Sequence, residues 1–194
     1  MLDAAVARRL KLVGFDVDGV LTDGGLYVGM IGGHPVELKR FQSQDGMGSW
    51  LLRGAGIAIA LVSGRSAEAT LIRARELEVE EVIQDPDGRG RKLEPFEALL
   101  ERRGIAWGEC AFVGDDLADL PLLTRAALPI AVANAVAEVK AAARVVTTAR
   151  GGEGAVREVA ELILKARGEW QGLVTKYFLE RGDVAHGVPP LRPR

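Results

Sequence analysis

The chain has 194 residues, of which 48% are hydrophobic and 27% are charged. This composition excludes a disordered chain, and the length fits one globular domain with a sizeable core. The formal net charge of −2 excludes a strongly basic surface for nucleic acid. The single cysteine, Cys110, lies in an apolar run, so we expect a buried thiol and no internal disulfide.

No apolar run approaches the ~20 residues that are needed to span a bilayer. Residues 1–9 carry charges, and no long apolar core follows them, so the sequence predicts no signal peptide. We therefore expect a cytoplasmic protein that contacts neither membrane nor nucleic acid.

Apolar runs alternate with helical patterns along almost the whole chain. Short apolar runs bounded by glycine or polar residues predict strands at 11–17, 57–62, 81–84, 111–113, 128–132 and 144–147. Helical spacing and caps predict helices at about 45–54, 66–77, 93–103, 120–123, 136–143 and 155–165. Asp45 is expected to cap the first of these helices and Ser66 the second.

Two further strand-like runs surround Gly32-Gly33 and predict a β-hairpin at about 26–41. Its apolar side chains, Leu26, Val28 and Met30, share one face and need a partner. That partner is either a neighbouring subunit or the rest of the same domain.

The alternation of strands and helices predicts an α/β fold, in which a doubly wound, mostly parallel sheet has helices on both faces. We expect a single domain over residues 1–180. Residues 181–194 are rich in Gly and Pro and are expected to form a flexible tail. The stretch after Lys165 either forms a helix that docks on a neighbour or completes the core.

Reactive side chains follow three of the apolar strands. Asp16 and Asp18 end the first strand, Ser63 ends the second, and Asp115, Asp116 and Asp119 follow a third. In a parallel sheet these ends share one edge, where α/β proteins bind ligands. Two adjacent carboxylates repel each other unless a cation lies between them, which favours a hard divalent metal.

Lys92 stands at the start of a predicted helix and is the only lysine between Lys39 and Lys140. Alone, each of these residues has an ordinary explanation as a turn residue, a helix cap or a solvated side chain. Together, carboxylates, a hydroxyl and an ammonium around a metal suit a phosphate, because they offset its charge and bind its oxygens. The order of the residues therefore favours a phosphate site.

These residues resemble the motifs of the haloacid dehalogenase superfamily of aspartyl phosphatases. Asp16-Val17-Asp18-Gly19-Val20 matches the first motif, Ser63 the second, Lys92 the third, and Gly114-Asp115-Asp116 with Asp119 the fourth. The resemblance spans about residues 11–165.

The resemblance implies that Asp16 is the nucleophile and that Asp18 is the general acid and base. It implies Mg²⁺ as cofactor, held by Asp16, Asp115 and the backbone carbonyl of Asp18. Ser63, Gly64 and Lys92 would bind the phosphoryl group, and Asp116 and Asp119 would act from outside the metal's ligand set.

Only about forty residues separate Asp18 from Ser63, which leaves no room for a cap domain. The hairpin, Asp45-Gly46-Met47-Gly48, Ser63-Gly64-Arg65 and Gly151-Gly152-Glu153-Gly154 are similar to the capless 3-deoxy-D-manno-octulosonate 8-phosphate phosphatase family. That resemblance implies a homotetramer whose subunits complete each other's sites, a role in lipopolysaccharide synthesis, and a sugar-acid carboxylate bound by Arg65. An ordinary surface ion pair is the alternative for Arg65.

Three other functions stay open at this point. The first is a phosphatase for a nine-carbon, sialic-type sugar-acid 9-phosphate. The second is a receiver-like phosphoacceptor, although receivers carry their lysine last in the chain. The third is a regulatory domain that assembles with a nucleotide-sugar enzyme. The loop 85–91 is longer and more basic than the resemblance predicts, which leaves substrate choice open.

Overall fold

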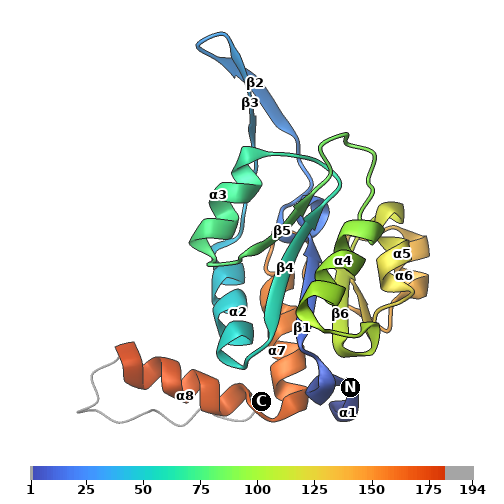
Figure 1. Cartoon of the computed structure of the whole chain (residues 1–194). Helices are drawn as coiled ribbons and strands as arrows, with labels where there is room; N and C mark the ends of the chain where they lie inside the picture. The colour runs from blue at the N-terminus through green and yellow to red at the C-terminus, as the bar shows by residue number, and fades with distance from the viewer. Residues whose placement is uncertain (1, 182–194) are drawn as a thin grey trace.

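A six-stranded parallel sheet forms the centre of the molecule in a computed structural model that describes residues 2–181 (Figure 1). The strand order is β5-β4-β1-β6-β7-β8, so the first strand of the sequence lies in the middle of the sheet. The strands are β1 (Leu12–Asp16), β4 (Ala58–Ser63), β5 (Glu81–Gln84), β6 (Cys110–Gly114), β7 (Leu128–Ala131) and β8 (Val145–Val146). The predicted doubly wound α/β fold is confirmed.

Helices precede, connect and follow these strands and cover both faces of the sheet. They are α1 (Ala4–Arg9), α2 (Ser43–Gly54), α3 (Glu68–Glu76), α4 (Leu93–Arg103), α5 (Leu120–Leu123), α6 (Ala137–Ala142), α7 (Ala155–Arg167) and α8 (Trp170–Arg181). Right-handed crossovers place α2 and α3 on one face and α4, α5 and α6 on the other (Figure 1). No helix in residues 2–181 is long and apolar enough to cross a membrane.

The sheet register brings the chemically active strand ends to one edge. Asp16 at the end of β1 pairs with Val62, next to Ser63 at the end of β4, and Phe15 pairs with Val113 on β6. β1 is buried along its whole length. A Cβ on Gly14 would lie within 2.8 Å of both Phe96 on α4 and Phe112 on β6, so glycine is required for α4 to pack on the sheet at this point.

The hairpin projects from the body of the domain (Figure 1). Its strands are β2 (Tyr27–Ile31) and β3 (His34–Leu38), and a single antiparallel bridge between Thr22 and Phe41 closes its base. Both faces are apolar, not one as predicted, because alternate residues point to opposite sides. The large exposed hydrophobic side chains on it are Leu26, Tyr27, Val28, Met30, Ile31 and Leu38. The alternative that the hairpin packs on its own domain is therefore wrong.

Two predicted helix caps are wrong. α2 begins before Asp45, which lies inside the first turn, and α3 begins after Ser66, whose hydroxyl instead donates to Gln84 Oε1 at 3.2 Å. α1 was not predicted, whereas the stretch after Lys165 forms a helix, α8, as one of the two predicted alternatives had it. Trp50 on α2 packs edge-on against Tyr177 on α8, with ring centroids 5.1 Å apart. The predicted tail lies, from residue 182 onward, outside the described residues.

Asp45 links α2 to α7 and was misassigned because its partner is distant in sequence. Its Oδ1 accepts a hydrogen bond of 2.9 Å from the backbone N–H of Arg157, in the first turn of α7. Nothing among the described residues bonds its Oδ2. Burial raises the pKa of Asp45 to about 6, against the hydrogen bond from Arg157 and the charge of Arg73. Asp45 thus stabilises the free N-terminus of α7, the helix that packs beside α2.

This raised pKa predicts a pH dependence of stability. An aspartate in the unfolded chain has a pKa near 3.9, so between about pH 4 and 6 the unfolded state loses its proton before the folded state does. The free energy of unfolding therefore falls as the pH rises through this window. Asp45→Asn has no proton to lose, so between pH 4.5 and 7.5 its stability relative to wild type should improve by about 2 kcal/mol.

Urea unfolding at several pH values measures this difference. Asp87→Asn, which changes an exposed aspartate, serves as the control and should show no such trend. A stability difference between wild type and Asp45→Asn that stays constant with pH contradicts the assignment.

Candidate active site

The side chains predicted from the ends of separate strands meet at one edge of the sheet. One pocket is lined by Asp16, Asp18, Gly64, Arg65, Lys92, Asp115 and Asp116, together with residues 88–90 and Ala118. Ser63 lies beneath it and is buried. Asp119 is also buried and contacts Lys92. All of the predicted site residues are thus brought together.

Lys92 holds the centre of the site. Lys92 is only 5% exposed, and its ammonium donates to Asp16 Oδ1 and, at 2.7 Å, to Asp119 Oδ1. Burial alone would lower the pKa of Lys92, but the two carboxylates outweigh burial and raise it. The lysine therefore stays charged and ties β1 to the segment that follows β6.

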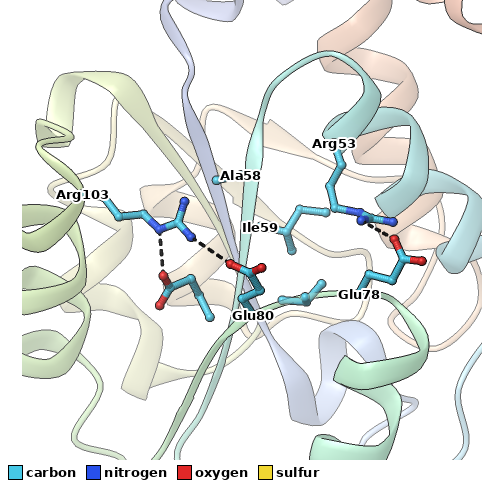
Figure 2. Close-up of a pocket in the computed structure, with 8 residues that line it drawn as sticks. Arg53, Ala58, Ile59, Glu78, Glu80 and Arg103 are labelled. Atoms are coloured by element: carbon cyan, nitrogen blue, oxygen red, sulfur yellow. Dashed lines mark hydrogen bonds and ion pairs between the residues drawn. The ribbon is translucent and has the colours of Figure 1, made fainter.

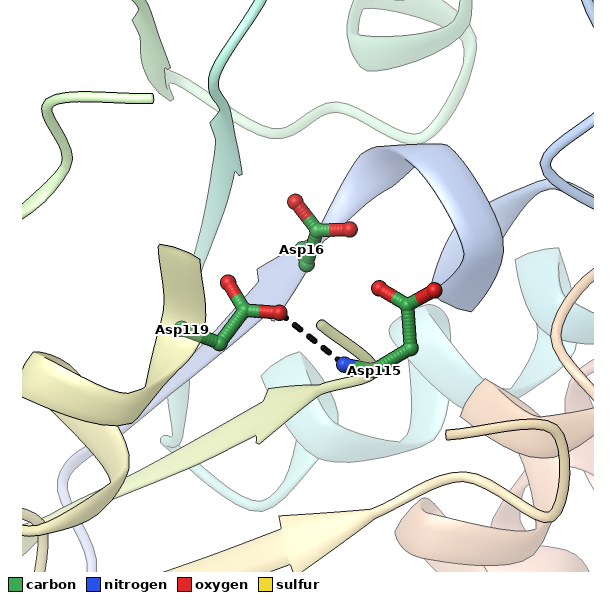
Figure 3. A group of neighbouring side chains, drawn as sticks. All are labelled: Asp16, Asp115 and Asp119. Atoms are coloured by element: carbon green, nitrogen blue, oxygen red, sulfur yellow. Dashed lines mark hydrogen bonds between the residues drawn. The ribbon is translucent and has the colours of Figure 1, made fainter. Parts of the chain in front are cut away.

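Three carboxylates lie close together at this edge of the sheet, those of Asp16, Asp115 and Asp119 (Figure 3). One oxygen each from Asp16, Asp115 and Asp119 lies within 4.8 Å of the others. Burial, followed by the charge of Asp119, raises the pKa of Asp16 well above its usual range and that of Asp115 to about 6. One ammonium does not balance three carboxylates, of which those of Asp16 and Asp119 are buried and that of Asp115 is half-buried. The cluster therefore has the oxygen donors and the excess negative charge that suit a hard divalent cation.

Asp119 and Asp116 differ from the other acids of the site in their hydrogen bonds and in their exposure. Asp119 Oδ2 accepts hydrogen bonds from the backbone N–H groups of Asp115 (2.9 Å) and Asp116 (3.3 Å), so both of its oxygens are engaged within the protein. Asp116 is exposed at the rim and accepts from the N–H of Leu117 at 2.7 Å. Asp119 thus fixes the loop that carries Asp115.

Asp18 is held by two donors. Ser63 Oγ donates to Asp18 Oδ2 at 3.1 Å, and the ammonium of Lys39 donates to Asp18 Oδ1. The side chain of Lys39 is only 1% exposed and also lies 3.5 Å from Glu37. Arg65, at the pocket, forms an ion pair of 2.8 Å with the other oxygen of Glu37.

Lys39 was missed from the sequence. Its only signal is its position: it is the first residue after the hairpin's return strand, two before Phe41 at the hairpin base. A charged residue at that point is ordinarily solvated, and only the fold brings it to Asp18, 21 residues away.

A glycine turn positions the backbone below the pocket. Gly19 has a φ of +101°, and a Cβ there would overlap the Asp115 carboxylate. The side chain of Asn134 donates to the Gly19 carbonyl at 2.9 Å and accepts from the N–H of Gly151 at 2.6 Å. Asn134 was also missed, because a single asparagine after β7 carries no pattern.

A second hollow lies at the opposite edge of the sheet, where β4 and β5 begin (Figure 2). Its charged side chains are paired with one another: Arg53 with Glu78 at 2.7 Å, and Arg103 with Glu81 at 2.7 Å. Since these ion pairs satisfy the charges, this hollow offers no group for catalysis.

Comparison with known proteins agrees with this geometry. Residues 87–159 match the haloacid dehalogenase-like hydrolase family. The 3-deoxy-D-manno-octulosonate 8-phosphate phosphatase of Escherichia coli K12 is 40% identical over 165 residues, which cover 85% of each chain. The chain belongs to this phosphatase family.

Solved structures support the same assignment. The phosphatase of Moraxella catarrhalis, in complex with magnesium, phosphate and KDO, has a TM-score of 0.83 at 37% identity, and the match covers 90% of this chain and 97% of that one. The phosphatase of Yersinia pestis has a TM-score of 0.80 at 36% identity, with 87% and 88% covered. Family membership in an enzyme class favours catalysis over the receiver-like and regulatory alternatives.

The close contact between Gly151 and Gly19 generates a prediction. A Cβ on Gly151 would overlap the Gly19 carbonyl oxygen and lie 2.9 Å from that of Thr22, so Gly151→Ala must displace the turn that follows Asp18. We expect a loss of about 2 kcal/mol in stability and at least a tenfold loss of hydrolase activity. Melting curves and phosphate release measure the two effects.

Gly108→Ala is the matched control, because a Cβ there meets no atom within 4 Å and the backbone is not left-handed. It should melt and turn over like wild type. Wild-type activity in Gly151→Ala would show that the turn does not depend on this contact.

Proposed function

We propose that this protein is a magnesium-dependent phosphomonoester hydrolase that converts 3-deoxy-D-manno-octulosonate 8-phosphate to the free sugar acid and phosphate. The observation that carries the proposal is the arrangement of Asp16: a buried carboxylate held by Lys92, beside Asp115 and below a pocket. The chain's membership in the phosphatase family supplies the substrate class.

In the first step Asp16 attacks phosphorus, the bond between phosphorus and the ester oxygen breaks, and an aspartyl-phosphate forms. Asp18 gives its proton to the departing sugar oxygen. In the second step Asp18 takes a proton from water, which attacks the same phosphorus and releases Asp16. Covalent catalysis divides one difficult displacement into two easier ones.

The contacts of Asp18 support its role as acid and base. Lys39 and Ser63 hold its two oxygens, so the side chain has a fixed orientation two residues from the nucleophile. Lys39 acts as a positioning residue, since it contacts Asp18 and not the reacting atoms.

Ser63, Gly64 and Lys92 bind the phosphoryl oxygens. Lys92 already bonds Asp16, so its ammonium lies beside the attacking oxygen, and Gly64 lets the backbone approach because it has no side chain. The resemblance implies that Arg65 binds the sugar-acid carboxylate, and to do so its guanidinium must leave the ion pair with Glu37.

Mg²⁺ would be held by Asp16, Asp115 and the backbone carbonyl of Asp18. When bound, it offsets the charge of the phosphoryl group and the repulsion between the carboxylates. Asp119 is already bonded to Lys92 and to two backbone N–H groups, and Asp116 lies at the rim. Both are assigned to positions outside the metal's ligands.

A phosphate-release assay tests the proposal. We expect release from 3-deoxy-D-manno-octulosonate 8-phosphate in Mg²⁺, none after EDTA, and recovery when Mg²⁺ is restored. Asp16→Asn should lower the rate at least about a thousandfold while the circular dichroism spectrum stays that of wild type.

Full activity in Asp16→Asn would end the nucleophile assignment, and hydrolysis in EDTA would end the metal assignment. The assay should include a sialic-type sugar-acid 9-phosphate. If that ester has the higher kcat/KM, the nine-carbon alternative replaces the eight-carbon substrate.

We also propose a homotetramer in which neighbouring subunits complete each other's sites. The hairpin supports this proposal, since it exposes six large hydrophobic side chains, including Val28 (73%) and Met30 (67%). Exposed apolar surface of this extent is typical of an interface. A site without a cap domain also needs another cover to exclude water.

Light scattering tests the assembly. We expect a mass of four chains for wild type and a smaller assembly for the double variant Val28→Asp, Met30→Asp, because two charges on one apolar face of the hairpin oppose its burial. Ile72→Asp is the control, as Ile72 is an exposed hydrophobic residue on α3, away from the hairpin. A wild-type protein that is monomeric in solution would contradict the proposed tetramer and the role of the hairpin in it.

Three further assignments belong with this proposal. Residues 1–180 act as one domain, the reaction takes place in the cytoplasm, and its product serves lipopolysaccharide synthesis. The continuous sheet and its shared core support the first, and the resemblance to the phosphatase family supports the other two.

A further inference from the structure

The loop 85–91 forms one rim of the active-site pocket and is anchored at its base. The carboxylate of Asp85 is buried and accepts hydrogen bonds from the backbone N–H groups of Asp87 (3.0 Å), Arg89 (2.9 Å) and Arg91 (3.0 Å). The N–H of Asp85 donates to the carbonyl of Ser63 at 3.0 Å. The loop is therefore fixed to the strand end that carries a predicted phosphate ligand.

Glycines let this loop approach the other walls of the pocket. A Cβ on Gly64 would lie 3.0 Å from the Cα of Gly90, and a Cβ on Gly90 would lie 3.3 Å from the Cβ of Ala118. Gly88 and Gly90 have φ values of +65° and +71°, in the left-handed region that favours glycine. The loop thus crosses from β4 to the segment after β6 and brings Arg89 to the pocket that Asp16 and Asp18 line.

The cations at this pocket differ in what they already bind. Lys92 bonds Asp16 and Asp119, and Arg65 forms an ion pair with Glu37. Within residues 2–181, no carboxylate forms an ion pair with Arg89, whose side chain is exposed. Arg89 is therefore a pocket arginine whose guanidinium is available to an incoming anion.

We propose that Arg89 binds the carboxylate of the sugar acid and so selects acidic over neutral phosphate esters. The inference rests on the proposed function. The phosphoryl group must reach Asp16 at the buried end of the pocket, so the rest of the substrate extends toward the rim, where Arg89 lies. A guanidinium binds a carboxylate through two parallel hydrogen bonds, and the anchored loop fixes its position. Arg65 shares this task only if it leaves Glu37.

Steady-state kinetics of Arg89→Gln test the inference, with 3-deoxy-D-manno-octulosonate 8-phosphate and p-nitrophenyl phosphate as substrates. We expect KM for the sugar-acid ester to rise at least tenfold while kcat changes less than threefold. The aryl ester has no carboxylate, so its kcat/KM should stay that of wild type. Arg89→Lys should recover part of the loss, because it keeps the charge but not the planar fork.

Arg91→Gln is the matched control. Arg91 belongs to the same loop but lines a neighbouring hollow with Leu93, Glu94 and Pro121. The substitution Arg91→Gln should leave kcat/KM for both substrates unchanged. Equal losses on both esters, or equal effects of Arg89→Gln and Arg91→Gln, would overturn the inference.

A binding measurement separates this inference from the proposed function. Calorimetry with the free sugar acid, 3-deoxy-D-manno-octulosonate, needs no turnover. Wild type should bind it at least tenfold more tightly than Arg89→Gln does, whereas Arg91→Gln should match wild type. A difference at Arg89 in a protein that releases no phosphate would sustain the inference and end the proposed function. If wild type and Arg89→Gln bind the free sugar acid equally and wild type hydrolyses the ester, the proposed function stands and the inference about Arg89 is wrong.

Discussion

The structure depends on how one buried ammonium accommodates the negative charge at the end of the central strand. Lys92 comes from the start of α4, and its bonds to Asp16 and Asp119 join three segments that are otherwise far apart in the sequence. Removing one partner of a buried charge pair leaves the other uncompensated, which costs more than the pair itself contributes. Because the three carboxylates still outnumber the ammonium, the site retains an affinity for a further cation. The same imbalance that makes the cluster costly in the free protein thus makes it suited to a metal, and the charge of that metal would in turn attract a phosphate.

Backbone segments around the site pack against one another at glycines. Gly19 and Gly151 meet where any side chain would overlap a carbonyl or a carboxylate, and Asn134 ties both to the segment after β7. The loop that contains Gly151 leads directly into α7, whose first turn is held by Asp45. The turn after Asp18 is therefore connected through short contacts to α7 and α2, two helices on one face of the sheet. A substitution in α2 or α7 can therefore shift the turn after Asp18 although the substituted residue does not contact the site.

The sequence predicted what depends on local pattern and missed what depends on distant contacts. The bounds 93–103 and 120–123 were confirmed, since apolar spacing and flanking glycine or aspartate determine them. Asp45 and Ser66 were assigned as caps because such residues ordinarily cap the helix that follows, but tertiary partners hold both. The strand-end acids could be found because the sheet brings all carboxyl ends to one edge. Lys39 could not, because nothing in its neighbours indicates that a hairpin returns it to Asp18.

The two parts that rise above the sheet edge, the hairpin and the loop 85–91, share a design that compensates for the absence of a cap domain. Each is largely exposed, yet each is bonded at its base to a residue of the site: the hairpin through Lys39 to Asp18, and the loop through Asp85 to Ser63. A rim built in this way can vary in length and charge without disturbing the core, since few core contacts depend on it. The acids proposed for catalysis, Asp16 and Asp18, lie at and just after the end of the central strand, whereas Arg89, proposed to distinguish substrates, lies on the loop 85–91. Chemistry and selectivity are thus carried by parts of the chain that can change independently.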